Sequence, residues 1–295
     1  MIREKIKGGH TMSFSENELI NPKVEDESSL EEKENEHKSV YISLKDISLS
    51  YTQGSGDIEA LRDVNLEFYN NDFICVLGPS GCGKSSLLNI IAGYIKPSSG
   101  SVIVDGKEHI KPDPEVGVVF QQPNLLPWLN IEKNIEFGLK MKKVPKDKRK
   151  EITKYYLEMV QLESFSGLLP HQLSGGMKQR AAIARTLAAD PKIILLDEPF
   201  SALDALTREK MQNHLHSIWE KTQKCLFFIT HDVDEALLLG KRIIIMHPKP
   251  GRIIKDFMNP LSKFKSKSFR LLRSTKEFSE MREYLIDQIQ IEEDK

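Results

Sequence analysis

Two fixed glycines and a lysine–serine pair stand out as the residues of this chain best suited to chemistry. They belong to one stretch, which reads Gly78, Pro79, Ser80, Gly81, Cys82, Gly83, Lys84, Ser85 and Ser86. Glycines permit a tight turn, with some positive φ, that brings backbone N–H groups against a polyphosphate. In a loop of this form the Lys84 ammonium reaches the β- and γ-phosphates, and the Ser85 hydroxyl ligates Mg²⁺. The stretch predicts a nucleotide-binding loop; a glycine-rich turn with a chance lysine is the alternative.

The segments on either side of this loop have the patterns that it requires. Phe73–Leu77 is apolar throughout and predicts a buried strand, whereas Ser86–Ala92 predicts a helix. A helix that starts near Lys84 aims the positive end of its dipole at the same phosphates. Strand, loop and helix therefore occur in the order that a phosphate-binding loop needs.

A pair of carboxylates follows a second apolar strand. Ile193–Leu196 leads directly into Asp197 and Glu198. A site that hydrolyses nucleoside triphosphates needs a carboxylate to hold Mg²⁺, and Asp197 is suited to this role. Glu198 is the natural general base for a water molecule that attacks the γ-phosphate. The alternative for Asp197 is an ordinary turn residue at a strand end.

Three further residues lie where they could complete such a site. His231 ends an apolar strand and could hydrogen-bond the γ-phosphate, although a lone histidine there is usually structural. Gln121 follows the apolar strand predicted over Val116–Phe120. Tyr51 precedes Lys84 by 33 residues and could stack on an adenine ring, or it could be an ordinary strand aromatic.

Composition places the chain among globular proteins and decides little about partners. It has 295 residues, of which 39% are hydrophobic and 29% charged, and a formal net charge of −1. No apolar run approaches the roughly 20 residues of a membrane span, and we find no apolar core typical of a signal peptide near the N-terminus. The three cysteines form no C-x-x-C pair, which favours reduced thiols.

The pattern along the chain predicts one large domain with two extensions. Residues 1–39 are polar and acidic and predict a disordered tail. Residues 40–260 alternate strands with helices, with a glycine-rich turn expected over 52–59, and predict an α/β domain with its sites at the strand C-terminal ends. Residues 261–295 begin basic and become an amphipathic helix, which suits docking on the domain itself or, less well, an anionic membrane surface.

These motifs together resemble the ATP-binding subunits of ABC transporters over residues 40–260. The most specific likeness is Leu173–Arg180, here called the signature motif, in which Ser174 is placed to cap a helix. The resemblance implies a P-loop NTPase fold with a mixed sheet core, an N-terminal antiparallel β subdomain and an α-helical subdomain at about 124–185. It also implies ATP and Mg²⁺ as cofactors, with Ser85, Gln121 and Asp197 near the metal.

In this family the signature motif caps the γ-phosphate of ATP bound to the opposite subunit. The resemblance therefore implies that Ser174, Gly175 and Gly176 act on a second copy of the chain in a head-to-tail homodimer. It implies catalytic roles for Lys84, Gln121, Glu198 and His231. Asp204 would communicate between the two ATP sites.

A finer likeness lies in three segments: residues 121–128, 170–172 and 250–253. They are similar to importers of nitrate, aliphatic sulfonates and taurine, which implies separate permease subunits, an extracytoplasmic solute-binding protein and a place on the cytoplasmic face of the membrane. Leu125–Leu129 would contact the permease or simply pack the helical subdomain. An ABC ATPase that acts on nucleic acid, or an exporter subunit, is the alternative, although this chain has neither the long coiled coil of repair types nor a second ATPase domain. We also expect Cys82, if it is exposed, to react with alkylating reagents.

Overall fold

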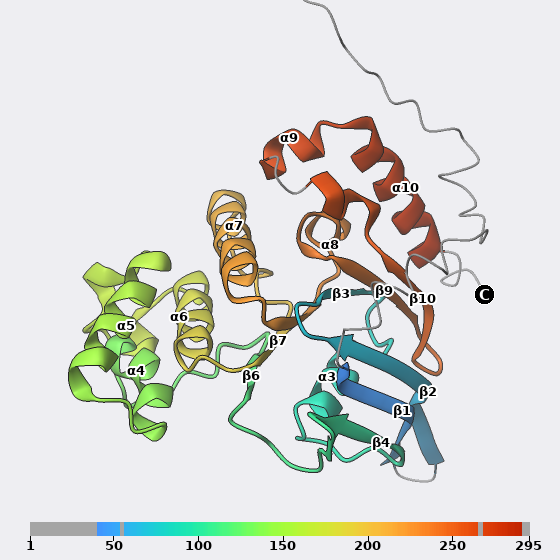
Figure 1. Cartoon of the computed structure of the whole chain (residues 1–295), viewed down its shortest axis with the longest axis horizontal. Coiled ribbons are helices and arrows are strands. Elements are labelled where there is room, and N and C mark those ends of the chain that lie inside the picture. The colour runs from blue at the N-terminus through green and yellow to red at the C-terminus, as the bar shows by residue number, and fades with distance from the viewer. Residues whose placement is uncertain (1–39, 54–55, 265–267, 291–295) are drawn as a thin grey trace, which may run out of the picture. The chain divides into compact units, whose positions relative to one another are not determined.

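The computed structural model describes residues 40–53, 56–264 and 268–290; the predicted acidic tail and two positions of the basic run, Lys265 and Lys267, lie outside them. A six-stranded mixed sheet holds the predicted phosphate-loop strand near its middle, in the order β10-β9-β3-β8-β7-β6 (Figure 1). Its strands are β3 (Phe73–Leu77), β6 (Val116–Val119), β7 (Ile193–Asp197), β8 (Cys225–Ile229), β9 (Arg242–His247) and β10 (Arg252–Met258). All neighbours pair in parallel except β9 and β10.

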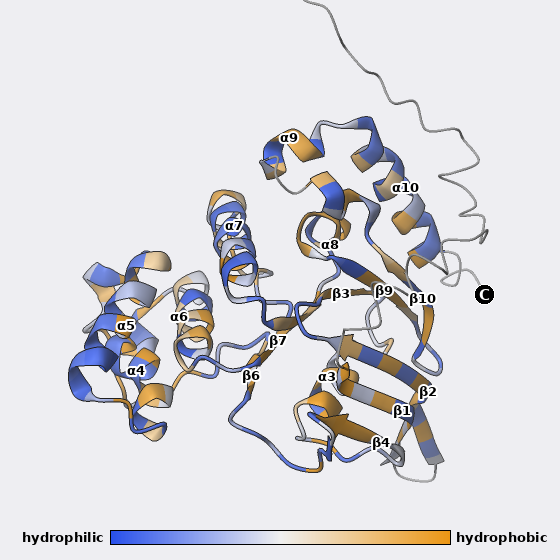
Figure 2. Ribbon diagram, in the orientation of Figure 1, coloured by the Kyte–Doolittle hydropathy of each residue, from blue (hydrophilic) through white to orange (hydrophobic). Residues whose placement is uncertain are grey.

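The apolar runs of the sequence become strands that are covered on both faces. Every residue of β3 and β8 is buried, as expected for central strands of a parallel sheet. Successive side chains of β3 alternate between two apolar clusters, so that Cys75 joins one cluster and Ile74 and Val76 join the other. Figure 2 shows the resulting hydrophobic centre, in contrast to the hydrophilic helix α5 (Lys146–Met159) at the periphery.

A separate antiparallel sheet packs against the second of these clusters. It contains β1 (Val40–Gln53), β2 (Gly56–Tyr69), β4 (Ser99–Val104) and β5 (Lys107–Glu108) in the order β2-β1-β4-β5. The turn expected over residues 52–59 is wrong for most of its length, because β1 and β2 remain paired as far as Gln53 and Gly56. This end of the hairpin is exposed, so its strands need no apolar residues and give no apolar signal.

The helical subdomain extends from the edge of the mixed sheet (Figure 1). It contains α4 (Ile131–Met141), α5, two short 3₁₀ helices (Glu163–Phe165 and Pro170–Gln172) and α6 (Gly175–Ala188). Asn134 of α4 is fully buried; its side chain accepts from Leu126 N at 2.8 Å and donates to Leu129 O at 2.8 Å. The apolar segment before α4 is thereby fixed to the helix.

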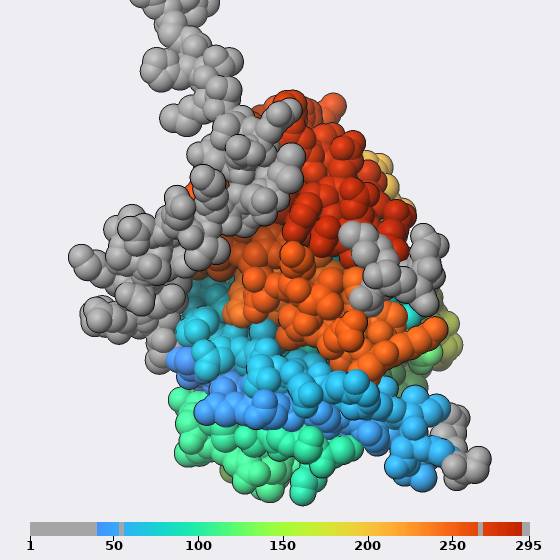
Figure 3. All heavy atoms as spheres, turned by 90° about the vertical axis from the view of Figure 1, so that its right-hand side faces the viewer, coloured from blue at the N-terminus to red at the C-terminus, as the bar shows by residue number. Residues whose placement is uncertain are grey.

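The C-terminal helices pack on the α/β domain. These helices are the 3₁₀ helix Pro260–Phe264, α9 (Phe269–Arg273) and α10 (Lys276–Gln290). Three other helices of the domain precede them in the chain: α3 (Lys84–Ile91), α7 (Ala205–Thr222) and α8 (Val233–Leu239). Leu285 of α10 is fully buried, and the Arg282 guanidinium donates to the Asp234 carboxylate of α8 at 2.8 Å. Figure 3 shows these helices, in red, next to the late strands in orange. The described part of the extension thus follows the docked-helix interpretation.

No helix within residues 40–53, 56–264 and 268–290 combines the length and the apolar character that crossing a bilayer would require. The longest of these helices, α7, has 18 residues and carries charged side chains along its length.

Candidate functional site

The loop between β3 and α3 depends on glycine at the point where the helix begins. Gly83 precedes α3 with φ of 90°, in the left-handed region that residues with a Cβ atom rarely adopt. A Cβ atom at this position would also lie 2.5 Å from Leu61 Cδ2. The predicted helix start at Lys84 is confirmed, and the backbone N–H groups of the first turn of α3 point toward the loop.

Lys84 is turned inward against the carbonyl oxygens of this loop. Its side chain is buried, and Nζ donates to Gly78 O at 2.7 Å and to Pro79 O at 2.8 Å. A buried ammonium needs such partners, because an unpaired charge away from water is costly. The loop therefore holds a cation among its own backbone groups, ready to exchange these carbonyl oxygens for those of an anion.

Cys82 does not meet the condition set for its reactivity. Its side chain is fully buried, with Sγ 3.6 Å from Lys84 Nζ. Burial raises the pKa of the thiol, and the nearby lysine offsets this only in part. In this conformation the loop folds the Cys82 side chain inward, so the condition on which its alkylation was predicted is not met.

Asp197 and Ser85 meet below the phosphate loop although 112 positions separate them in the sequence. The Ser85 hydroxyl hydrogen-bonds the Asp197 carboxylate at the end of β7. Burial raises the pKa of Asp197; this hydrogen bond and the Lys84 charge oppose the effect, while the Glu198 charge adds to it. A buried carboxylate beside a hydroxyl provides two oxygen donors of the kind that Mg²⁺ accepts.

Replacing Asp197 by asparagine should raise the melting temperature at neutral pH. The pKa of Asp197 is higher in the folded chain than in the unfolded chain, so the ionised carboxylate destabilises the fold at high pH. That penalty disappears as the pH falls through the folded-state pKa. Thermal unfolding should therefore show a stabilised variant at neutral pH and a shrinking difference on acidification. Asp287→Asn, which changes an exposed carboxylate on α10, is the control and should leave the melting temperature unchanged.

Gln121, Glu198 and His231 come together at the ends of three parallel strands. The Gln121 amide donates to Glu198 Oε2 at 3.4 Å, and His231 Nδ1 lies 3.1 Å from the same oxygen. Glu198 itself has φ of 45°, an uncommon value for a residue with a side chain. Its N–H donates to Ile229 O at 3.0 Å, which holds this backbone turn against β8. The carboxylate is thus placed between an amide and an imidazole.

Tyr51 lies beside the start of α3. Its hydroxyl is 3.3 Å from Ser86 Oγ, and 41% of the residue is exposed. The ring therefore presents an accessible aromatic face next to the phosphate loop. This is the placement expected of a residue that stacks on a nucleotide base.

The signature motif begins helix α6 of the helical subdomain. Ser174 caps α6, since its Oγ accepts from Met177 N at 3.3 Å. A Cβ atom on Gly175 would meet nothing within 4 Å, whereas one on Gly176 would lie 3.3 Å from Ala202 O. The motif thus packs beside the segment Ser201–Asp204, and its first N–H groups end a 14-residue helix at the surface.

Asp204 begins the next helix. Its carboxylate caps α7 by accepting from Thr207 N at 3.0 Å, and this bond lowers the pKa of Asp204. The residue is exposed. Asp204 is therefore ionised and faces solvent next to the signature motif.

Two side chains of α6 for which the sequence predicted no separate role, one of them inside the signature motif, hold the segment after β6. Gln179 is buried and donates to Phe120 O at 3.2 Å, and Arg185 donates to Asn124 O at 2.8 Å. Both acceptors are backbone carbonyl oxygens, which every residue type has, so these hydrogen bonds cannot be predicted from the sequence. They tie the segment that begins at Gln121 to the helix that begins at the signature motif.

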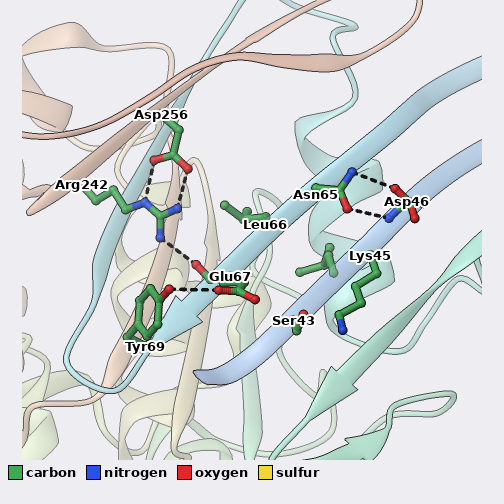
Figure 4. A pocket seen from close by; sticks show the side chains of 10 residues that line it. Ser43, Lys45, Asp46, Asn65, Leu66, Glu67, Tyr69, Arg242 and Asp256 are labelled. Carbon is green, nitrogen blue, oxygen red and sulfur yellow. Dashed lines mark hydrogen bonds and ion pairs between the residues drawn. The ribbon is translucent and has the colours of Figure 1, made fainter. Parts of the chain in front are cut away.

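A hollow of about 420 Å³ lies elsewhere, where the antiparallel sheet meets β9 and β10 (Figure 4). Its charged groups largely bind one another: Arg242 pairs with Asp256 and donates to Glu67 O at 2.7 Å. The Asn65 amide likewise donates to Asp46 at 3.0 Å. None of the predicted site residues lines it, so we do not assign the chemistry to this hollow.

The chain is similar to many ATP-binding proteins of transporters. The sequence profile of the ABC transporter family matches residues 61–201. An uncharacterized ABC transporter ATP-binding protein of Methanocaldococcus jannaschii is 49% identical over 76% of this chain and 84% of its own length. The taurine import ATP-binding protein TauB of Roseobacter denitrificans is 44% identical, over 84% of this chain and 93% of its own. The aliphatic sulfonates import ATP-binding protein SsuB of Bacillus cereus is 42% identical, over 84% and 96%.

Solved structures agree with this similarity. An ATP-binding cassette described as a dimer in a post-hydrolysis state, bound to ADP and Pi, superimposes with a TM-score of 0.68 at 37% identity. The match covers 74% of this chain and 98% of that chain. The mixed sheet, the antiparallel sheet and the helices confirm the predicted α/β architecture. The chain belongs to the ABC transporter family, as one of its ATP-binding proteins.

Proposed function

We propose that this chain hydrolyses ATP to power the uptake of a small solute, taurine or a related sulfonate, through separate permease subunits. The observation that carries the proposal is the convergence of Gln121, Glu198 and His231 at the strand ends beside the phosphate loop. The similar taurine and sulfonate import proteins support the importer class and the solute class. Nitrate, suggested by the sequence alone, remains a second solute to test.

Nucleotide binding rests on the loop, one aromatic ring and one cation. The backbone N–H groups of the loop and of the first turn of α3 would bind the phosphates, with Lys84 turning from Gly78 O and Pro79 O to the β- and γ-oxygens. Tyr51 would stack on the adenine. The loop residues assigned to this role are Gly78, Pro79, Ser80, Gly81, Cys82, Gly83, Lys84, Ser85 and Ser86.

The metal site proposed for Mg²⁺ fits the donors that are present. Ser85 and Asp197 already share a hydrogen bond, and Gln121 lies at the neighbouring strand end. Within residues 40–53, 56–264 and 268–290, no three His, Cys, Asp or Glu side chains form a cluster suited to a metal. Magnesium does not need such a cluster, because it is held by one or two protein oxygens together with phosphates and water. When bound, it would neutralise charge on the phosphates.

Glu198 is the proposed general base. Its carboxylate accepts from the Gln121 amide and contacts the His231 imidazole, so both its position and its orientation are restrained. A base held in this way can take a proton from a water molecule lined up with the γ-phosphate. His231, two-thirds exposed in its side chain, would orient that water and contact the γ-phosphate.

The complete site requires a second copy of the chain. Similar cassettes have been solved as dimers, which supports a homodimer. We infer a head-to-tail arrangement in which Ser174, Gly175 and Gly176 of one copy contact the γ-phosphate held by the other. The exposed start of α6 favours an anion there. Asp204, beside this motif, would carry the signal between the two ATP sites.

The permease would bind the segment that follows Gln121. Trp128 in this segment is 71% exposed, while Asn134 and Arg185 fix the backbone around it. An exposed tryptophan on a fixed backbone is typical of a protein-binding surface. Through the permease the chain would lie on the cytoplasmic face of the membrane and act with an extracytoplasmic solute-binding protein.

Co-expression with a candidate permease tests this function most directly. The two should co-purify, and proteoliposomes that contain them and a solute-binding protein should accumulate taurine or an alkanesulfonate only with ATP and Mg²⁺. Efflux of the solute would indicate an exporter instead. Stable co-purification with nucleic acid, and none with a permease, would contradict the importer proposal.

A further inference from the structure

The residue before His231 belongs to a buried polar cluster. Thr230 is 2% exposed, and its hydroxyl donates to Glu235 Oε2 at 2.6 Å. The other carboxylate oxygen of Glu235 accepts from the Gln212 amide at 3.1 Å. Glu235 and Gln212 are 5% and 1% exposed and lie on α8 and α7. These three residues are named the Thr230 cluster.

The bonding in the Thr230 cluster fits an ionised Glu235. Both oxygens of Glu235 act as acceptors, as an ionised carboxylate does. Burial opposes that ionisation and raises the pKa of Glu235, while the two hydrogen bonds favour it. An apolar side chain of the same size would often stabilise the fold as well as the buried Glu235 carboxylate does, or better. Stability alone therefore does not explain a charged group at this position.

His231 depends on its neighbours for its position. Among the described residues the polar contact of its ring is the one with Glu198, and two-thirds of its side chain is exposed. The backbone on either side of it is fixed. Thr230 N donates to Val76 O at 3.2 Å, and Asp232 N donates to the Thr230 hydroxyl at 3.0 Å. The Thr230 hydroxyl thus closes the turn that carries the histidine.

Helix α7 connects this turn to the segment beside the signature motif. Gln212 belongs to the Thr230 cluster, and one turn earlier Arg208 donates to Leu203 O at 3.0 Å. The Arg208 guanidinium also lies 3.9 Å from the Asp232 carboxylate, which caps α8. Hydrogen bonds and an ion pair thus connect Leu203, through α7, to both residues that flank His231.

We infer that Thr230 is a positioning residue, whose hydroxyl, anchored by Glu235 and Gln212, fixes His231 against Glu198. This inference deepens the proposed function and rests on its assignment of His231 to hydrolysis. It adds a side chain that never touches the nucleotide, and it explains a buried carboxylate that the reaction itself does not use. Through α7, the same anchor makes the position of His231 depend on the segment Ser201–Asp204.

The test compares Thr230→Val with Thr230→Ser. Valine keeps the shape and loses the hydroxyl, so kcat for ATP hydrolysis should fall about 10-fold to 100-fold, as expected for a misplaced group. KM for ATP should change by less than about twofold, because no phosphate contact is lost. Serine should restore most of kcat. Thr222→Val is the matched control: Thr222 is exposed at the end of α7, its hydroxyl donates to Ile218 O, and kcat should not change.

The decisive measurement is kcat of Thr230→Val combined with His231→Ala. If Thr230 acts through His231, Thr230→Val should cause no further loss there. Additive losses, or an unchanged kcat in Thr230→Val itself, would overturn the inference and leave the proposed function intact. Full activity in His231→Ala would instead overturn the inference together with the role that the proposed function gives to His231. If Thr230→Val does not fold, Gln212→Met, which removes the donor to Glu235, should give a smaller loss that His231→Ala also masks.

Discussion

Replacing Glu198 by glutamine is expected to lower the rate of ATP hydrolysis by at least about 100-fold while ATP remains bound. Glutamine can still pair with Gln121 and His231, so the site should keep its shape. It cannot take a proton from water. The γ-phosphate would then persist between two copies of the chain, and an ATP-bound dimer should accumulate. Phosphate release measures the rate, and size-exclusion chromatography with light scattering measures the dimer.

The control for this change is Glu151→Gln, an exposed position on α5, which should leave both readouts at the parent level. If Glu198→Gln hydrolyses ATP at near the parent rate, Glu198 is not the base. If it is inactive but remains monomeric with ATP, the carboxylate acts in hydrolysis and the dimer proposal fails.

Replacing Lys84 by alanine should weaken ATP binding or abolish turnover. The ammonium is the buried cation of the phosphate loop, with Nζ 2.7 Å from Gly78 O. Its loss removes charge-assisted contacts to the phosphates, each of which contributes about 1.5–3 kcal/mol, or roughly 10-fold to 100-fold in affinity. Binding of a fluorescent ATP analogue and steady-state hydrolysis report the two effects.

Lys96→Ala provides the comparison, because Lys96 is exposed and lies shortly after α3. It should bind and hydrolyse ATP normally. Melting temperatures of both variants separate loss of the site from loss of the fold, since alanine at position 84 leaves two carbonyl oxygens without their donor. Full activity in Lys84→Ala would show that the phosphates bind elsewhere.

Local sequence patterns predicted the elements that flank the phosphate loop, because neighbouring residues determine where these elements form. The apolar run 73–77 has to be buried, and Gly83 and Lys84 mark a loop that enters a helix. Ser174 likewise reveals its capping role by type and position. The hairpin end at 52–59 was missed because exposed strands need no apolar alternation.

Contacts between residues far apart in the sequence could not be predicted from local patterns. The burial of Cys82 depends on how the loop folds over its own side chain, and no neighbour in sequence indicates it. Parallel strands made it possible to expect Gln121, Glu198 and His231 near one another, although not that they share one carboxylate oxygen. The Thr230 cluster combines single polar residues from α7, from α8 and from the position after β8, and none of them forms a motif by itself.

The proposed mechanism divides the ATP site into two halves, the phosphate loop and the signature motif, which one chain holds at the starts of α3 and α6. In the described residues, the hydrogen bonds of Ser174 and of Lys84 belong to separate regions of the fold. Each half is suited to binding an anion: the phosphate loop through Lys84 and the start of α3, and the signature motif through the start of α6. We therefore regard the pairing of the two halves across copies as the central claim of the proposed mechanism.

Cross-linking between chains that each carry one added, exposed cysteine tests this claim most directly. The natural cysteines are at most 2% exposed, whereas Ser80 and Ser174 are exposed. A tagged Ser80→Cys chain and an untagged Ser174→Cys chain, both with Glu198→Gln, would be mixed and treated with a short bismaleimide. We predict a product that joins tagged to untagged chains, dependent on ATP and Mg²⁺ and absent with Lys84→Ala. No such product, together with a cross-link inside a single chain that carries both cysteines, would contradict the shared site.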